Sequence, residues 1–264
     1  MAILNVTPDS FSDGGRHAEV ERAVVHAKRM VEQGADIIDI GGESTRPGAQ
    51  TVPVEEELRR TVPAVKAIRA AFADADEEPI LSIDTRKLEV AKACILAGCD
   101  VWNDVTALTY SPHSLEVAAE LGCDLILMHS RGTPETMQDR PSYGDAVSEI
   151  RDYLAARMDA CDAVGIDPGR ITIDPGIGFG KRLEDNLAIL ANVRTFADLA
   201  PTLIGASRKS FIAKLDGSQV EARLGGSLSS AVIAAQGGAS VVRVHDVAET
   251  KQALVVAEAV QKNS

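Results

Sequence analysis

Short apolar runs alternate with longer amphipathic stretches along the whole chain. The apolar runs, which are typical of buried strands, fall at residues 3–6, 36–40, 80–83, 101–103, 125–128, 171–173, 203–204 and 241–244. Apolar positions recur with the helical period at roughly 19–33, 54–72, 87–97, 112–121, 144–164, 184–198, 220–236 and 247–261. Eight strands alternating with eight helices predict an α/β fold, a single-domain (β/α)8 TIM barrel over residues 1–264. A doubly wound open sheet is the alternative, although it usually has fewer units or a second domain.

A four-residue pattern marks three of the predicted joints between a helix and the next strand. It reads glycine, a small residue, aspartate and an apolar residue, at 34–37, 98–101 and 122–125. Glycine accommodates the left-handed residue that ends a helix, and a short polar residue begins the next strand. Cys99 and Cys123 stand where the first copy has Ala35, so we assign them to packing. With Cys94 and Cys161 they show no spacing typical of a metal site.

The overall charge and hydropathy exclude several classes of partner. The net charge is −12, and no basic cluster exceeds two adjacent residues, which argues against a nucleic acid partner. No apolar run approaches the ~20 residues needed to cross a bilayer, so we expect no membrane association. We also expect no signal peptide before the first strand, and therefore a cytoplasmic protein.

Polar residues follow the predicted strands at the end where barrels carry their chemistry. Acceptor groups come from Asp84, Asn103 and Asp174. Carboxylate and amide oxygens suit a heterocycle that is rich in N–H groups. Cationic groups, which suit phosphate, come from Arg46, Lys209, Arg243 and His245. His245 beside Asp246 is equally consistent with a structural pair, but Arg243 shares the same strand face.

Two connections are longer than a strand-to-helix joint needs. Residues 6–16 and 41–52 are polar and rich in glycine, which is typical of functional loops. A third segment, Ile171 to Lys181, runs from a β-branched strand into Asp174-Pro175 and then through three glycines. Proline ends the strand at the carboxylate. By itself, Asp174 could equally be a helix cap.

Four segments closely resemble those of bacterial dihydropteroate synthase. They are residues 5–15 (Asn-Val-Thr-Pro-Asp-Ser-Phe-Ser-Asp-Gly-Gly), 39–48 (Asp-Ile-Gly-Gly-Glu-Ser-Thr-Arg-Pro-Gly), 174–181 (Asp-Pro-Gly-Ile-Gly-Phe-Gly-Lys) and 207–210 (Ser-Arg-Lys-Ser). The resemblance covers nearly the whole chain, in order. It implies a (β/α)8 barrel that condenses 6-hydroxymethyl-7,8-dihydropterin diphosphate with 4-aminobenzoate in folate biosynthesis. It also implies release of pyrophosphate, a transferase that is a sulfonamide target, and usually a homodimer.

The same resemblance assigns residues to three parts of a site. The pterin would be bound by Asp84, Asn103, Asp174, Lys209, Met128 and Gly205. The diphosphate would be bound by Asn5, Thr45, Arg46, Arg243 and His245, and Asn5 would also bind Mg²⁺. The 4-aminobenzoate pocket would be formed by Phe11, Thr45, Pro47, Ser207 and Lys209.

Three positions depart from the family pattern. The chain begins only a few residues before the first predicted strand, Ser130-Arg131-Gly132 stands where relatives often have Met-Gln-Gly, and Ala206 replaces a bulkier apolar residue. None of these changes removes a residue that the resemblance assigns to the site.

Two other functions share part of this pattern. A pterin-binding methyltransferase that uses methyltetrahydrofolate would share the barrel and the pterin carboxylates. It would need neither the diphosphate site nor the two glycine-rich loops. A non-catalytic pterin-binding protein would not need both these loops and the cationic set.

Overall fold

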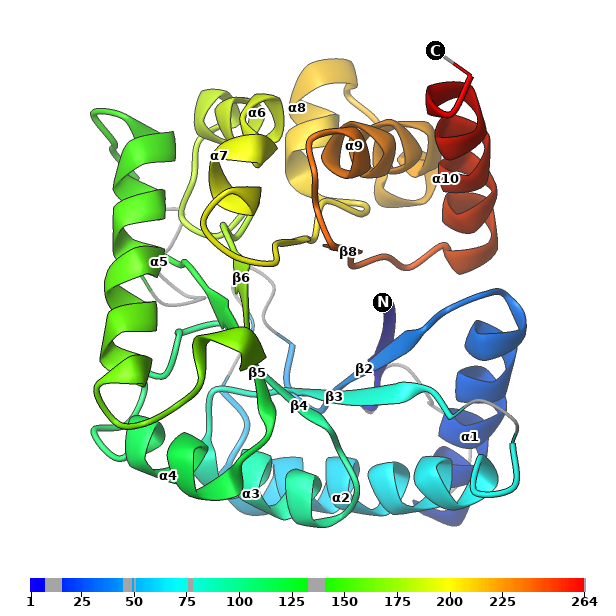
Figure 1. Ribbon diagram of the computed structural model, residues 1–264. Helices are drawn as coiled ribbons and strands as arrows, with labels where there is room; N and C mark the ends of the chain where they lie inside the picture. Colours follow the sequence, from blue (N-terminus) through cyan, green and yellow to red (C-terminus); the bar gives the residue numbers. More distant parts are fainter. Residues whose placement is uncertain (8–15, 45–48, 50, 76–77, 133–140, 264) are drawn as a thin grey trace.

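Parallel strands form the centre of the molecule, and helices surround them (Figure 1). The computed structural model describes residues 1–7, 16–44, 49, 51–75, 78–132 and 141–263. The strands in this part of the chain are β1 (Ala2–Asn5), β2 (Ile37–Gly41), β3 (Ile80–Asp84), β4 (Val101–Asp104), β5 (Asp124–Met128), β6 (Ile171–Asp174), β7 (Leu203–Ile204) and β8 (Val241–Val242). The helices are α1 (Arg16–Glu32), α2 (Val54–Ala71), α3 (Leu88–Leu96), α4 (Ser114–Leu121), α5 (Ala146–Asp162), α6 (Leu183–Ala191), α7 (Val193–Ala197), α8 (Ser210–Asp216), α9 (Leu224–Gln236) and α10 (Val247–Gln261).

Backbone hydrogen bonds close the strands into a ring. Strands β1 to β6 pair in sequence order, all parallel, and β7 pairs with β8. The two groups meet where Ile173 N donates to Pro201 O (2.9 Å) and where Ile3 N donates to Val244 O (3.1 Å). Isolated parallel bridges Ile173↔Thr202 and Ala2↔Val244 lie at these junctions. The predicted (β/α)8 barrel is confirmed.

Helix boundaries differ from the predicted ones in the last third of the described chain. The helix predicted at 184–198 is two helices, α6 and α7, because Asn192 leaves the helical conformation (φ −125°, ψ 32°). The short helix α8, which Gly217 ends in a left-handed conformation (φ 76°), had no prediction. Strand β8 covers only the first half of the predicted run.

The core lies between the barrel wall and the helices that cover it. Trp102, Phe196 and Ile150 are among its largest fully buried side chains. All four cysteines are unpaired and buried, as expected for packing residues. Polar side chains are enclosed at the carboxyl ends of the strands, and this is the part of the barrel that carries the candidate site. None of the described helices has both the length and the apolar character required to cross a membrane.

Candidate active site

Three acceptor side chains gather at the carboxyl ends of β3, β4 and β6. Asp84, Asn103 and Asp174 are only 7%, 5% and 6% exposed. The strand register places Asp84 beside Asn103, and Asp174 beside Met128 of β5. Parallel strands bring their carboxyl ends to one rim, so residues far apart in sequence meet there. The predicted acceptor cluster therefore exists, and Met128 belongs to it.

Arg243 lies between two carboxylates. Its Nε donates to Asp39 Oδ2 at 2.6 Å, and its Nη2 donates to Asp84 Oδ2 at 2.8 Å. Asp39, on β2, is fully buried and also accepts hydrogen bonds from Ser82 Oγ (2.6 Å) and Asn103 Nδ2 (3.2 Å). The guanidinium is thus part of the acceptor cluster, whereas the sequence placed it with the phosphate-binding cations.

Burial and neighbouring charges set the protonation of the two aspartates. Burial raises the pKa of Asp84 to about 7; the Arg243 guanidinium opposes this shift and Asp39 adds to it. Asp84 Oδ1 is buried and has no hydrogen-bond partner among the described residues. Burial also raises the pKa of Asp174, against the attraction of Lys209, while Asp174 Oδ1 accepts from Gly176 N at 2.7 Å. A buried acceptor without a donor is costly, so the cluster suits a ligand that brings N–H groups.

Lys209 joins this cluster from the segment after β7. Its ammonium donates to the backbone carbonyl of Ile177 and lies 4.6 Å from the centre of the Phe179 ring. Burial lowers the pKa of Lys209 to about 8, and the charge of Asp174 limits the shift. A Cβ placed on Gly205 would lie 3.9 Å from Lys209 Nζ and 3.8 Å from Arg243 Cβ. These are ordinary van der Waals distances, so Gly205 lies between the two cationic side chains and in reach of both.

A second group of predicted residues lines a cleft of about 370 Å³ beside β1. Asn5 and His245 lie on its wall together with Arg29 of α1 and Arg208. Ser207 Oγ accepts from His245 N at 3.2 Å and lies 3.0 Å from His245 Nδ1. The neighbouring Asp246 accepts from Arg208 (Nε to Oδ2, 3.0 Å).

Known proteins share this architecture and much of this sequence. The family model described as "Pterin binding enzyme" matches residues 1–245. A dihydropteroate synthase of Escherichia coli strain K12 is 48% identical over 260 residues, which cover 98% of this chain and 90% of that protein. This chain belongs to the pterin binding enzymes, among the dihydropteroate synthases.

Solved structures of this family agree closely with the fold. The Xanthomonas albilineans dihydropteroate synthase with 4-aminobenzoic acid is 48% identical, with a TM-score of 0.90 over 99% of this chain and 92% of that one. The Yersinia pestis dihydropteroate synthase in a sulfonamide drug complex is 43% identical, with a TM-score of 0.91 over 99% of this chain and 94% of that one.

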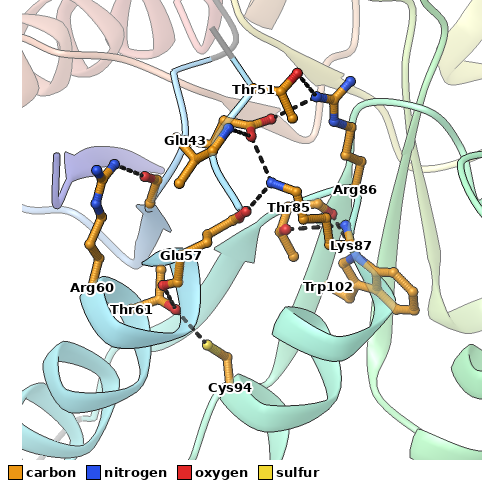
Figure 2. Close-up of polar contacts among 12 residues, drawn as sticks. Glu43, Thr51, Glu57, Arg60, Thr61, Thr85, Arg86, Lys87, Cys94 and Trp102 are labelled. Carbon is orange, nitrogen blue, oxygen red and sulfur yellow. Dashed lines mark hydrogen bonds and ion pairs between the residues drawn. The ribbon is translucent and has the colours of Figure 1, made fainter. Parts of the chain in front are cut away.

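In this pterin binding enzyme, a buried ionic network holds the described ends of the β2–α2 connection. Lys87 Nζ points between Glu43 and Glu57 and donates to both, at 2.6 Å to Glu43 Oε2 (Figure 2). Arg86 Nη2 lies 3.0 Å from Glu43 Oε1 and donates to Thr51 Oγ1 at 3.1 Å. Glu43 Oε2 also accepts from the backbone N–H of residue 52 at 2.7 Å. Arg86 and Lys87 come shortly after Asp84 in sequence, so the network connects this segment to the carboxyl end of β3.

Four predicted site residues lie outside the described residues. They are Phe11, Thr45, Arg46 and Pro47.

The sequence did not predict a role for three residues near the acceptor cluster, which are Asp39, Phe179 and Lys181. Lys181 is 1% exposed and donates to His129 O (3.2 Å) and Phe179 O (3.0 Å). Phe179 contacts Lys209, and Asp39 connects three strands. A charged residue inside an apolar strand, such as Asp39, indicates that it has buried polar partners. The identity of those partners depends on the register of the barrel strands, which the sequence does not give.

Among the described residues, no group of three or more His, Cys, Asp or Glu side chains is arranged to bind a metal. Mg²⁺ takes few protein ligands, commonly one or two carboxylates, and completes its shell with water and substrate phosphates. A Cβ on Gly41 would lie 3.7 Å from Asn5 Oδ1, so the amide oxygen of Asn5 lies beside the barrel rim. One amide oxygen beside a cleft that Arg29, Arg208 and His245 line fits that mode of Mg²⁺ binding.

Proposed function

We propose that this chain joins 6-hydroxymethyl-7,8-dihydropterin diphosphate to 4-aminobenzoate, releases pyrophosphate and forms 7,8-dihydropteroate. The observation that carries this function is the buried cluster of Asp84, Asn103 and Asp174, in which Asp84 Oδ1 has no donor among the described residues. A pterin presents amino and ring N–H groups along one edge, which would supply that donor. Membership of the dihydropteroate synthases supports the same reaction.

The pterin would lie across the strand ends. Asp84, Asn103 and Asp174 would accept its N–H groups, and Lys209 would donate to its acceptor atoms. Met128 and Gly205 would form the walls, since Met128 pairs with Asp174 and Gly205 separates Lys209 from Arg243.

The diphosphate would extend from the pterin towards the cleft that Asn5 and His245 share. Arg243 would serve both parts, because its Nε and Nη2 hold carboxylates while Nη1 has no partner among the described residues. Thr45 and Arg46 are proposed as further diphosphate contacts. Asn5, with the substrate phosphates, would bind Mg²⁺, which would neutralise the charge of the leaving group.

The 4-aminobenzoate would approach from the outer side of the pterin. Ser207 and Lys209 would line its pocket, and Phe11, Thr45 and Pro47 are proposed to complete it. In the Xanthomonas albilineans protein, the named ligand is 4-aminobenzoic acid.

In the reaction, the bond between the exocyclic carbon of the pterin and the bridging oxygen breaks, and its electron pair leaves with pyrophosphate. The positive charge left on carbon spreads into the pterin ring, where the buried carboxylates of Asp84 and Asp174 stabilise it. The aryl amine then attacks the carbon, and a proton leaves the new C–N nitrogen. Arg243 and His245 would stabilise the leaving group, and the enclosed rim would keep water from the carbon.

We further infer the organisation of the protein. Residues 1–264 would form one domain, because β1 and β8 from opposite ends of the chain complete one ring. A homodimer is supported by exposed valines on α10, Val255, Val256 and Val260. A cytoplasmic location is supported by the four unpaired cysteines.

The test measures pyrophosphate release from the pterin diphosphate with Mg²⁺, with and without 4-aminobenzoate. We expect release that depends on 4-aminobenzoate and gives 7,8-dihydropteroate. A methyltransferase would bind pterin without releasing pyrophosphate and would transfer a methyl group from methyltetrahydrofolate. A non-catalytic protein would bind pterin and do neither. Either of these outcomes would overturn the proposed reaction.

A further inference from the structure

Asp39 is fully buried within β2, and the proposed reaction requires no contact between it and a substrate. Its carboxylate accepts hydrogen bonds from three different strands or their extensions. The donors are Ser82 Oγ on β3 (2.6 Å), Asn103 Nδ2 on β4 (3.2 and 3.4 Å) and Arg243 Nε after β8 (2.6 Å). Burying a charged carboxylate costs desolvation free energy. We therefore expect any role of Asp39 to act through the side chains that donate to its carboxylate.

The first consequence of these contacts is the orientation of the Asn103 amide. The two ends of an amide have nearly the same shape but opposite hydrogen-bonding character. Because a carboxylate only accepts, Asn103 must turn its NH₂ group towards Asp39. Its Oδ1 then points away from Asp39 and has no hydrogen-bond partner among the described residues. The site therefore meets a ligand with an acceptor at this position.

The second consequence is the orientation of Arg243. The guanidinium is planar, so two contacts on one side fix its plane. Asp39 holds Nε and Asp84 holds Nη2, and Asp84 Oδ1 is left as a buried acceptor without a partner in the described chain. The same carboxylate of Asp39 thus orders both neighbours of the Asp84 side chain.

We propose that Asp39 is a positioning residue that sets the hydrogen-bond polarity of the pterin site, by holding Asn103 with its oxygen outward and Arg243 against Asp84. This inference rests on the proposed function. Asp39 reaches the substrate only through these two side chains. If Asp39 only held β2 against β3, it would act through Ser82. Its replacement would then not change which atom of the Asn103 amide faces the ligand.

Asp39→Leu tests this at nearly constant side-chain volume. The apolar side chain accepts neither from Asn103 Nδ2 nor from Arg243 Nε, so nothing at position 39 holds these two groups. The Asn103 amide can then turn its NH₂ group towards the pterin edge, and Arg243 is no longer held on two sides. We expect the affinity for 6-hydroxymethyl-7,8-dihydropterin, measured by calorimetry, to fall at least about tenfold. Ser82→Ala removes one donor to Asp39 but leaves Asn103 and Arg243 in place, and should change the affinity less than about threefold.

The conservative variant Asp39→Asn gives the sharper result. Arg243 Nε and Asn103 Nδ2 both donate to Asp39 Oδ2, so one amide oxygen in that place can accept from both, while its NH₂ group donates to the Ser82 hydroxyl. We therefore expect Asp39→Asn to keep pterin affinity within about threefold of the parent protein. Failure of Asp39→Asn to bind better than Asp39→Leu, with both proteins folded, would overturn the inference.

Each outcome separates this inference from the proposed function. If the parent protein binds no pterin, the proposed function fails. If the parent binds and Asp39→Leu binds equally well, the positioning role of Asp39 fails. Circular dichroism and thermal unfolding establish that the variants are folded. If Asp39→Leu does not fold, Asp39→Ala, which also removes both acceptors, decides the question: a loss of at least about tenfold in pterin affinity supports the inference, and an affinity within about threefold of the parent overturns it.

Discussion

Lys181 Nζ lies 2.9 Å from His129 Nδ1, and both side chains are buried beneath the glycine loop that follows β6. Burial lowers the pKa of His129 to about 3, and the charges of Lys181 and Arg131 act in the same direction. Burial also lowers the pKa of Lys181 well below its usual value, against the attraction of Asp174. His129 is therefore neutral, with Nδ1 as the acceptor. The contact between Lys181 and His129 therefore holds the segment after Asp174 against the end of β5.

His129 should make the protein less stable in mild acid. Its pKa of about 3 in the folded state lies below the ordinary value of 6.5, so the unfolded chain binds the extra proton between these values. The stabilisation is complete above about pH 6.5 and is lost as pH falls towards the folded value, by about 1.4 kcal/mol per pH unit for one proton. Urea unfolding between about pH 4 and pH 7 should show a shallower pH dependence in His129→Gln than in the parent.

His113 provides the matched control, because its side chain is 72% exposed. His113→Gln should leave the pH dependence of the unfolding free energy unchanged. Parallel curves for the parent and His129→Gln would show that the buried imidazole does not set the acid sensitivity.

Pterin affinity should rise with pH through about 7. Asp84 has its pKa raised to about 7 by burial, so below this value the empty site holds a protonated carboxyl group. The folded state then binds more protons than the unfolded chain between the ordinary value of 3.8 and about 7, and this contribution to stability decreases as pH rises through that window. A pterin N–H pairs best with the ionised form, so affinity should fall up to about tenfold per pH unit below 7. Calorimetry with Asp84→Asn should give weaker binding without this pH dependence, whereas an unchanged dependence would assign it to another group.

Arg243→Ala should weaken both forms of the pterin substrate, but not equally. The guanidinium holds Asp39 and Asp84, so its loss disturbs the pterin edge in either case. If Arg243 also binds the diphosphate, as we propose, the diphosphate form should lose at least about tenfold more affinity, because it would also lose an N–H donor to phosphate. Comparison of the diphosphate with the unphosphorylated hydroxymethylpterin measures the difference. Equal losses would show that Arg243 serves only the carboxylates.

Lys87→Met should destabilise the fold strongly. The change leaves Glu43 and Glu57 buried without their shared ammonium, while Arg86 reaches only Glu43 (Figure 2). Removing one partner from a buried ionic group typically costs about 3–5 kcal/mol. Denaturant unfolding measures this loss, and Lys92→Met on the exposed face of α3 should stay within about 0.5 kcal/mol of the parent. A similar small change for Lys87→Met would mean that water or rearrangement replaces the ammonium.

The sequence alone determined the alternation of strands and helices and the rim on which Asp84, Asn103 and Asp174 would meet. The spacing of the apolar residues along the chain identifies the strands and helices. The carboxyl ends of parallel strands in a barrel lie at one rim, so residues at those ends lie near one another. It also identified the family, because the motifs that carry the resemblance are continuous segments.

The tertiary structure alone decided the partners of the charged groups. Asp39 and Arg243 are separated by 204 positions and meet only because β8 returns beside β1. The sequence also did not predict the pairing of Asp246 with Arg208, the burial of Lys181 against His129 or the break between α6 and α7. A local pattern shows that a charge will be buried, but the side chain that neutralises it depends on barrel closure and strand register, which are properties of the whole chain.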